Sequence, residues 1–143
     1  MMEKMGYERL AIGVAAVATA EQAVAITTKY VKERMAFGKP LIDFQNTRFK
    51  LAECRTEARV ARVFLDRCIE RVLAGQLDDV TTAMAKYWLT DCECRIVDEC
   101  VQLHGGYGYM ADYPIARMWT DSRVHRIYAG TNEILKELIA SSL

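Results

Sequence analysis

The sequence predicts an all-α protein: an antiparallel up-and-down four-helix bundle with three long helices and a fourth side made of two short ones. Its 143 residues contain only two prolines and few glycine-rich stretches, so long uninterrupted elements are expected. Apolar side chains recur every three or four residues, which is the spacing of one helix face. No stretch shows the sustained apolar–polar alternation of a half-buried strand. The length fits a single domain.

The first two helices are separated by a glycine–proline break. The first is expected from Met5 to about Arg34 and stops at Phe37-Gly38-Lys39-Pro40, because proline and glycine interrupt a helix. The second runs from Phe44 to about Leu73 and closes at Ala74-Gly75-Gln76. The apolar positions expected to face the core are Leu10, Ala11, Val14, Ala18, Val24, Ile26 and Val31 in the first helix and Ala61, Leu65, Cys68 and Val72 in the second.

The third helix is expected to be capped by Asp78 or Asp79 and to run to about Leu103, with an apolar residue at every fourth position from Met84 to Cys100. Asp112-Tyr113-Pro114 offers a cap and a first-turn proline for a short helix to about Arg126. Tyr128-Ala129-Gly130 then breaks the pattern. Thr131 starts a last helix that reaches the C-terminus.

Charge and composition argue against several classes of function. The formal net charge is zero, with 19 basic and 19 acidic side chains, so neither nucleic acid nor an anionic membrane is expected as the main partner. No run is expected to reach the apolar length of a membrane span. The five cysteines contain no Cys-x-x-Cys pair and are interpreted as reduced, mostly buried thiols. Neither histidine follows a glutamate by three residues, so no metal site of the di-iron type is expected.

The segment Gln102–Tyr109 combines three glycines with aromatic residues and a histidine. The residues allow two interpretations: a helix C-cap followed by a turn, or a backbone cradle for a ligand. In an antiparallel bundle the end of the first helix, with Arg34, lies at the same pole as the start of the second, with Gln45, and the end of the third, with Gln102. An arginine beside exposed glycine backbone suits a pyrophosphate.

Three segments resemble signature segments of the acyl-CoA dehydrogenase family, in the family's order and spacing. The match covers the whole chain, but only as the family's C-terminal helical domain, spanning residues 1–143. The N-terminal helical and middle β-domains of the family are absent, so we expect Met1 to begin a fragment. Tyr7-Glu8-Arg9-Leu10 and Met84-Ala85-Lys86-Tyr87-Trp88 most resemble the long-chain branch. The signature segments are Glu33–Leu41 followed by Gln45, then Gln102–Tyr109, then Ile127–Ile134.

The resemblance implies which residues contact FAD and the acyl-CoA thioester. One group reaches FAD that is bound mainly by a neighbouring subunit, and a second touches FAD from the chain's own side. A third forms the wall around the acyl thioester. The first group is Arg34, Phe37, Gln45, Gln102, Leu103, His104, Gly105 and Gly106; the second is Thr131, Asn132 and Glu133; the third is Tyr7, Arg9, Tyr128 and Gly130.

The resemblance also implies the catalytic base. Most family members carry a glutamate between the tyrosine and glycine of the last segment, and here that position is Ala129. A minority, the long-chain and isovaleryl enzymes among them, carry it on the first helix just before an arginine. Glu8 followed by Arg9 fits that minority, so Glu8 is the expected base. Without the resemblance, Glu8 would be interpreted as a first-turn acid favoured by the helix dipole.

The implied activity is α,β-dehydrogenation of acyl-CoA, as in fatty-acid β-oxidation, with hydride transfer to FAD and onward transfer of electrons to an electron-transferring flavoprotein. The alternatives are a non-catalytic helical packing domain and an acyl-CoA oxidase. A homo-oligomer, dimer or tetramer, is expected from the resemblance. Chain-length preference and compartment, bacterial cytoplasm or mitochondrial matrix, stay open.

Overall fold

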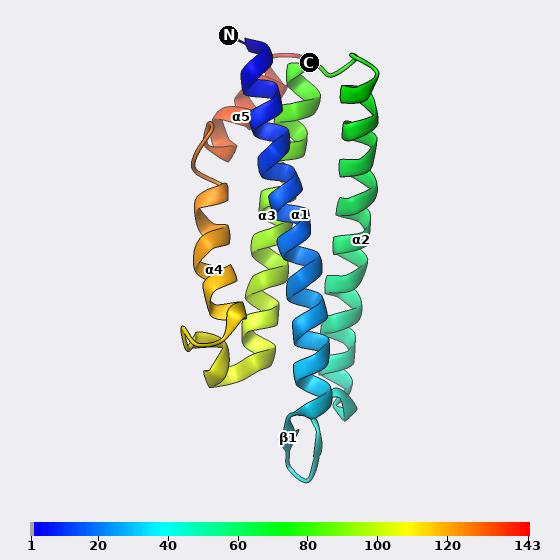
Figure 1. Cartoon of the computed structure of the whole chain (residues 1–143), viewed down its shortest axis with the longest axis vertical. Helices are drawn as coiled ribbons and strands as arrows, with labels where there is room; N and C mark the ends of the chain where they lie inside the picture. Colours follow the sequence, from blue (N-terminus) through cyan, green and yellow to red (C-terminus); the bar gives the residue numbers. More distant parts are fainter. Residues whose placement is uncertain (1) are drawn as a thin grey trace.

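The expected all-α bundle is confirmed by the computed structural model, which describes the backbone of residues 2–143 and the side chains from Gly6 onward (Figure 1). Three long helices run antiparallel, and two short helices cover the fourth side. Two short segments of 3-10 helix follow Pro40 and the third long helix. The helices are α1 (Met2–Glu33), α2 (Gln45–Leu73), α3 (Asp79–His104), α4 (Pro114–His125) and α5 (Asn132–Ala140), with η1 (Leu41–Asp43) and η2 (Gly105–Tyr109).

Two of the expected helix starts are capped by their own side chains. The Asp78 carboxylate accepts a hydrogen bond of 2.7 Å from the Thr81 backbone N–H at the start of α3. At the start of α5 the Thr131 hydroxyl accepts one of 3.4 Å from the Ile134 N–H. Each bond satisfies a backbone donor that the first helical turn leaves free.

The expected cap at Asp112 is wrong. Tyr113 is the residue before α4 and makes no side-chain cap bond, while Pro114 occupies the first turn. Asp112 therefore lies one residue too early to accept from the free N–H groups. Proline, whose φ is already helical and which has no N–H to satisfy, starts α4 without that cap.

A short hairpin with strands of two residues each follows α1, and the sequence did not predict it. Strands β1 (Met35–Ala36) and β2 (Lys39–Pro40) pair antiparallel, with Met35 opposite Pro40. The connecting residues, Phe37 and Gly38, both have positive φ, at 52° and 80°. Positive φ at both positions matches the right-handed twist of a tight hairpin. The hairpin projects beyond the end of the bundle (Figure 1).

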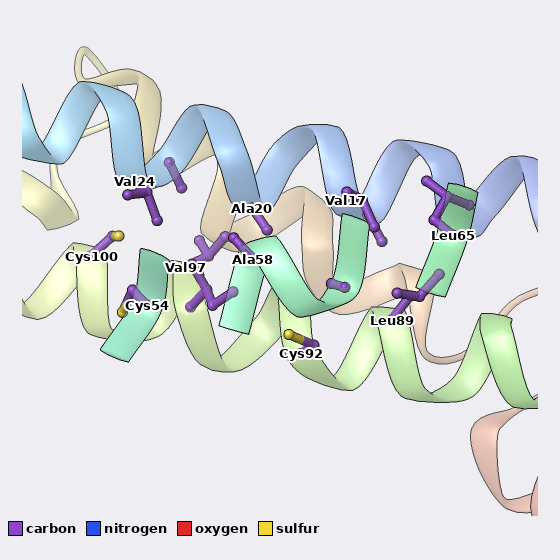
Figure 2. Packing of buried hydrophobic residues seen from close by; sticks show 14 of the residues in the cluster. Val17, Ala20, Val24, Cys54, Ala58, Leu65, Leu89, Cys92, Val97 and Cys100 are labelled. Carbon is purple, nitrogen blue, oxygen red and sulfur yellow. The ribbon is translucent and has the colours of Figure 1, made fainter. Parts of the chain in front are cut away.

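The core lies between α1, α2 and α3, and Figure 2 shows its small and branched side chains meeting there. The most extensive helix pairing is α1 with α3, and Gly13 permits it, because a Cβ there would lie 2.9 Å from Leu89 Cδ1. The face expected for α1 was partly wrong: Ala11, Val14 and Ala18 are exposed. The buried stripe of α1 instead contains Leu10, Gly13, Ala16, Val17, Ala20, Ala23, Val24, Thr27 and Val31.

The expectation that no run reaches the length of a membrane span needs correction. Within the segment Gly6–Glu33 of α1, a window of 18 residues has a mean hydropathy of 1.6, so this helix is long and apolar enough to cross a membrane by length and composition alone. In the structure this helix packs against α2, α3 and α4. A core helix of a bundle meets the same criterion, so its apolarity is accounted for by packing.

Candidate functional site

The ends of α1 and α3 enclose a hollow of about 670 Å³ at one pole of the bundle. Arg34 and Gln102, two of the residues expected there, lie on its wall. So do Leu103, His104, Gly105 and Gly106. The sequence did not single out the remaining lining residues, which are Tyr30, Leu41, Thr47, Tyr107 and Met110.

The hollow combines an arginine with exposed glycine backbone. The Arg34 guanidinium lies over the Tyr107 ring, 5.0 Å from its centroid, and it makes no ion pair with any residue that the structure describes. Gly105 has φ 61°, and a Cβ at Gly105 or Gly106 would meet nothing within 4 Å. A ligand can therefore approach the bare main chain beside an unpaired guanidinium.

His104 contributes to the hollow as a structural residue. Its ring stacks on Tyr30 with centroids 4.2 Å apart, and Nδ1 lies 2.8 Å from the Cys100 carbonyl oxygen. Burial lowers the pKa of His104. Because a carbonyl oxygen only accepts, Nδ1 donates the proton in this hydrogen bond. The Tyr30 hydroxyl donates to the His104 carbonyl at 3.2 Å, which secures the end of α3.

Two residues expected at this pole do not line the hollow. Phe37, at the tip of the hairpin, is 95% exposed. Its ring meets that of Phe44 edge-on, with the ring centroids 6.3 Å apart. Gln45, the first residue of α2, is exposed. Both lie outside the hollow.

The other expected groups lie toward the opposite pole, where α4 leads into α5 beside the start of α1 (Figure 1). Ala129 and Gly130 there have φ of 54° and 92°. A positive φ is uncommon for a residue with a Cβ, so this turn needs support from its surroundings. Tyr128 is exposed, and Thr131 caps α5.

That support comes from Lys86, which is fully buried on α3. Its Nζ donates to the Gly130 carbonyl oxygen at 2.8 Å and to Asn132 Oδ1 at 2.9 Å. Burial lowers the pKa of Lys86 to about 8, although the charge of Asp91 opposes this shift. The ammonium therefore fixes both the turn and the first residue of α5.

The structure disagrees with cofactor contact by the Asn132 side chain. Asn132 is 1% exposed, and its amide nitrogen donates to the Tyr87 carbonyl, the Thr90 hydroxyl and Asp91 Oδ1. All its polar atoms are used inside the bundle, because Asn132 points back toward α3. Glu133, next in the chain, is exposed, and a hydrogen bond from its own backbone N–H lowers its pKa.

Near the start of α1, Glu8 and Tyr7 are exposed while Arg9 is buried. Arg9 lies close enough to Lys86 for its charge to lower the pKa of that lysine. The Arg9 Nε atom has no hydrogen-bond partner among the described residues. Tyr7 lines a different hollow, of about 420 Å³, beside the turn between α2 and α3, and not one with Tyr128.

Comparison with known proteins decides the family. The chain matches the family model of the acyl-CoA dehydrogenase C-terminal domain over residues 1–143. It is 45% identical to the mitochondrial long-chain specific acyl-CoA dehydrogenase of Mus musculus, across 100% of this chain and 33% of that protein. The chain belongs to the acyl-CoA dehydrogenase family.

Solved structures of the family agree with this membership. The crystal structure of acyl-CoA dehydrogenase from Geobacillus kaustophilus has a TM-score of 0.95 and 48% identity, covering 99% of this chain and 37% of that one. An acyl-CoA dehydrogenase from Bacillus anthracis, complexed with FAD, has a TM-score of 0.89 and 29% identity, covering 96% and 27%. The chain spans about a third of the length of the curated relatives it matches.

The sequence analysis did not predict that a stripe of buried polar residues on α3 contacts the residues around the turn at 128–130, which we call the signature turn. Lys86, Thr90 and Glu93 are spaced four and three residues apart, so they share one helix face, and all three are buried. Each contacts a residue at or near that turn. Their spacing was a usable signal, but polar residues at helical spacing ordinarily indicate an exposed face.

Proposed function

We propose that this chain is the C-terminal domain of an FAD-dependent acyl-CoA dehydrogenase, which introduces an α,β double bond into acyl-CoA thioesters as in fatty-acid β-oxidation. It would work together with an N-terminal helical domain and a middle β-domain. The observation that carries the proposal is the unpaired Arg34 guanidinium beside the open backbone of Gly105 and Gly106, in a chain that matches this family along its whole length.

The residues that line the hollow beside Arg34 fit the pyrophosphate and the ADP half of FAD. The guanidinium offers a fork of donors for phosphate oxygens, and the Gln102 amide is exposed on the same wall. Phe37 and Gln45, which lie outside the hollow, would contact the cofactor from its rim. FAD, when bound, supplies the acceptor for a hydride leaving the substrate.

The two cofactor-contacting groups imply a homo-oligomer. Arg34 directly follows the end of α1, whereas Thr131 and Glu133 lie toward the pole where α1 begins. A 32-residue helix is about 48 Å long at about 1.5 Å per residue. Groups so far apart are better suited to two different FAD molecules, one held from the chain's own side and one held mainly by a neighbouring subunit.

The chemistry assigned to this chain is proton removal. The Glu8 carboxylate takes the α-proton of the thioester, and the β-hydride leaves to FAD, so that a double bond forms between the two carbons. Tyr128, Gly130, Tyr7 and Arg9 would wall the thioester. The Arg9 Nε atom is buried and has no hydrogen-bond partner among the described residues. An electron-transferring flavoprotein would accept the electrons from the reduced enzyme.

The test is a pair of variants in the intact enzyme, followed by stopped-flow bleaching of the flavin with acyl-CoA. Glu8→Gln should still bind acyl-CoA but lose on the order of 10²–10⁴-fold in the rate of flavin reduction. Adding Ala129→Glu should recover part of that loss. Ala129 already holds a Cβ at φ 54°, so a longer side chain adds little new backbone strain. Glu137→Gln, an exposed acid on α5, is the control.

A wild-type rate in the Glu8→Gln enzyme would remove Glu8 from the reaction. If the wild-type enzyme fails to bleach with any acyl-CoA, the chain is instead a helical packing domain without catalysis of its own. Rapid reoxidation of the reduced enzyme by oxygen would identify an acyl-CoA oxidase.

A further inference from the structure

A carboxylate is buried in the middle of α3 without an evident structural need. Glu93 is 0% exposed, and its Oε2 lies 2.8 Å from Nδ1 of His125 at the end of α4. Oε1 has no hydrogen-bond partner among the described residues. Burial raises the pKa of Glu93, while His125 and the nearby Thr19 of α1 oppose that shift. A buried carboxylate is costly to keep, so its pairing with His125 calls for a reason.

Through His125, the Glu93–His125 pair contacts Tyr128 at the signature turn. The His125 ring is stacked on Tyr128, with centroids 5.7 Å apart and planes 7° from parallel. Burial raises the pKa of Tyr128, and the Glu93 charge adds to the effect, so the carboxylate acts on this phenol as well. The contacts therefore run from α3 through α4 to the aromatic residue that precedes the left-handed Ala129–Gly130 turn.

We propose that Glu93 and His125 are positioning residues for Tyr128, which set its ring at the acyl-CoA site from inside the bundle. The Nδ1–Oε2 bond fixes the His125 ring, and that ring is the surface on which Tyr128 rests. Lys86 fixes the turn two residues later through the Gly130 carbonyl, so Tyr128 is held from both sides. This inference rests on the proposed function, because it assigns Tyr128 to the acyl-CoA site.

A role in bundle stability alone predicts something different. In that case a change at His125 would lower the melting temperature, and any effect on substrate would be independent of Tyr128. A positioning role makes the effect on substrate depend on the presence of the Tyr128 ring. A double-mutant cycle separates the two, because residues in contact give non-additive effects.

The experiment measures KM and kcat for acyl-CoA in the intact enzyme with His125→Gln, Tyr128→Ala and the double variant. His125→Gln keeps a donor for Glu93 but removes the ring. KM should rise about 5-fold, the size expected for a coupling between contacting residues, with FAD content unchanged. In the Tyr128→Ala background, His125→Gln should change KM less than about 2-fold. Asp121→Asn, on an exposed position of α4, is the control.

The outcomes are distinct. Equal multiplicative effects of His125→Gln in both backgrounds, in an enzyme that bleaches normally with acyl-CoA, would overturn the inference and leave the proposed function intact. An unchanged KM in Tyr128→Ala would overturn it by removing Tyr128 from the site. An inactive wild type would refute the proposed function. If His125→Gln fails to fold, Glu93→Leu, which breaks the same bond, carries the same cycle, and Glu93→Gln, which retains a partner for Nδ1, should restore KM.

Discussion

Lys86 is a buried cation whose ionisation is coupled to the stability of the fold. Its pKa is lowered from 10.5 to about 8, with burial as the main cause. Below pH 8 the lysine is protonated in both the folded and the unfolded chain, so the cost of burying its charge is fully present. Between pH 8 and 10.5 the folded chain releases the proton first, and the unfolded chain binds more protons. Stability therefore rises with pH in that window.

We expect the free energy of unfolding of the wild-type chain, minus that of the Lys86→Met variant, to increase as the pH rises from 8 to 10.5. The gain should approach about 1.4 kcal/mol per pH unit. Taking the difference between the two proteins cancels the other titrating groups. Urea unfolding at several pH values measures it, and a pH-independent difference would mean that Lys86 keeps an ordinary pKa. Lys29→Met, an exposed position on α1, is the control.

Arg34 is an arginine whose guanidinium stays free for a ligand. In the intact enzyme, Arg34→Ala should lower the FAD content more than it lowers the melting temperature of the apo-protein. Arg34→Lys should recover little, because an ammonium lacks the planar fork that bonds two phosphate oxygens. The ratio of flavin absorbance to protein absorbance measures occupancy. Lys32→Ala, two residues away and also exposed, should retain full FAD, and equal occupancy in all three would exclude Arg34 from the site.

At the scale of elements, the η2 turn shapes the backbone cradle that follows α3. Its glycines differ in their surroundings: Gly105 and Gly106 face open space, while Gly108 is buried against α3. A Cβ at Gly108 would overlap the Val101 carbonyl oxygen and come within 2.9 Å of His104 Cβ. Backbone atoms of a helix cannot move aside as a flexible side chain can.

Gly108→Ala should therefore destabilise the chain by about 1–3 kcal/mol, the usual cost of overpacking a filled site. Gly106→Ala, two residues earlier in the same turn, should change stability by less than about 0.5 kcal/mol. Thermal unfolding followed by circular dichroism measures both. Equal effects in the two variants would show that the packing of Gly108 against α3 does not limit this turn.

At the scale of the whole molecule, the bundle has a core of its own, whereas the residues proposed to contact FAD fall into two separate groups. The core lies between α1, α2 and α3, and the two short helices cover the remaining side. The residues proposed to contact FAD lie toward opposite ends of the bundle (Figure 1). Folding and cofactor retention are therefore expected to separate in this chain.

The purified 143-residue chain should give a strongly helical far-ultraviolet circular dichroism spectrum and be colourless. Long amphipathic helices bury enough apolar surface between them to form a bundle, whereas FAD would lack most of its contacts. A yellow preparation with stoichiometric FAD would contradict the second half of this prediction. A coil-like spectrum would contradict the first.

The sequence alone determined the helical class, the bounds of the helices to within a few residues and the family. Helical periodicity, the cap at Asp78 and the break at Gly38-Lys39-Pro40 are local features, and local backbone preferences are sufficient to produce them. The sequence also predicted that Arg34 and Gln102 lie at the same end of the bundle, because the order of antiparallel helices decides which helix ends are neighbours.

Only the tertiary structure decided which faces are buried and which polar side chains point inward. The alanine-rich α1 has almost no contrast between its faces, so Ala11 and Val14 could be assigned to the core or to the surface with equal ease. Lys86 and Glu93 appear as ordinary surface residues until Asn132 and His125, more than thirty residues away in the chain, supply their partners. Burial of a polar group depends on such distant partners, because only a hydrogen bond or an opposite charge offsets its loss of water.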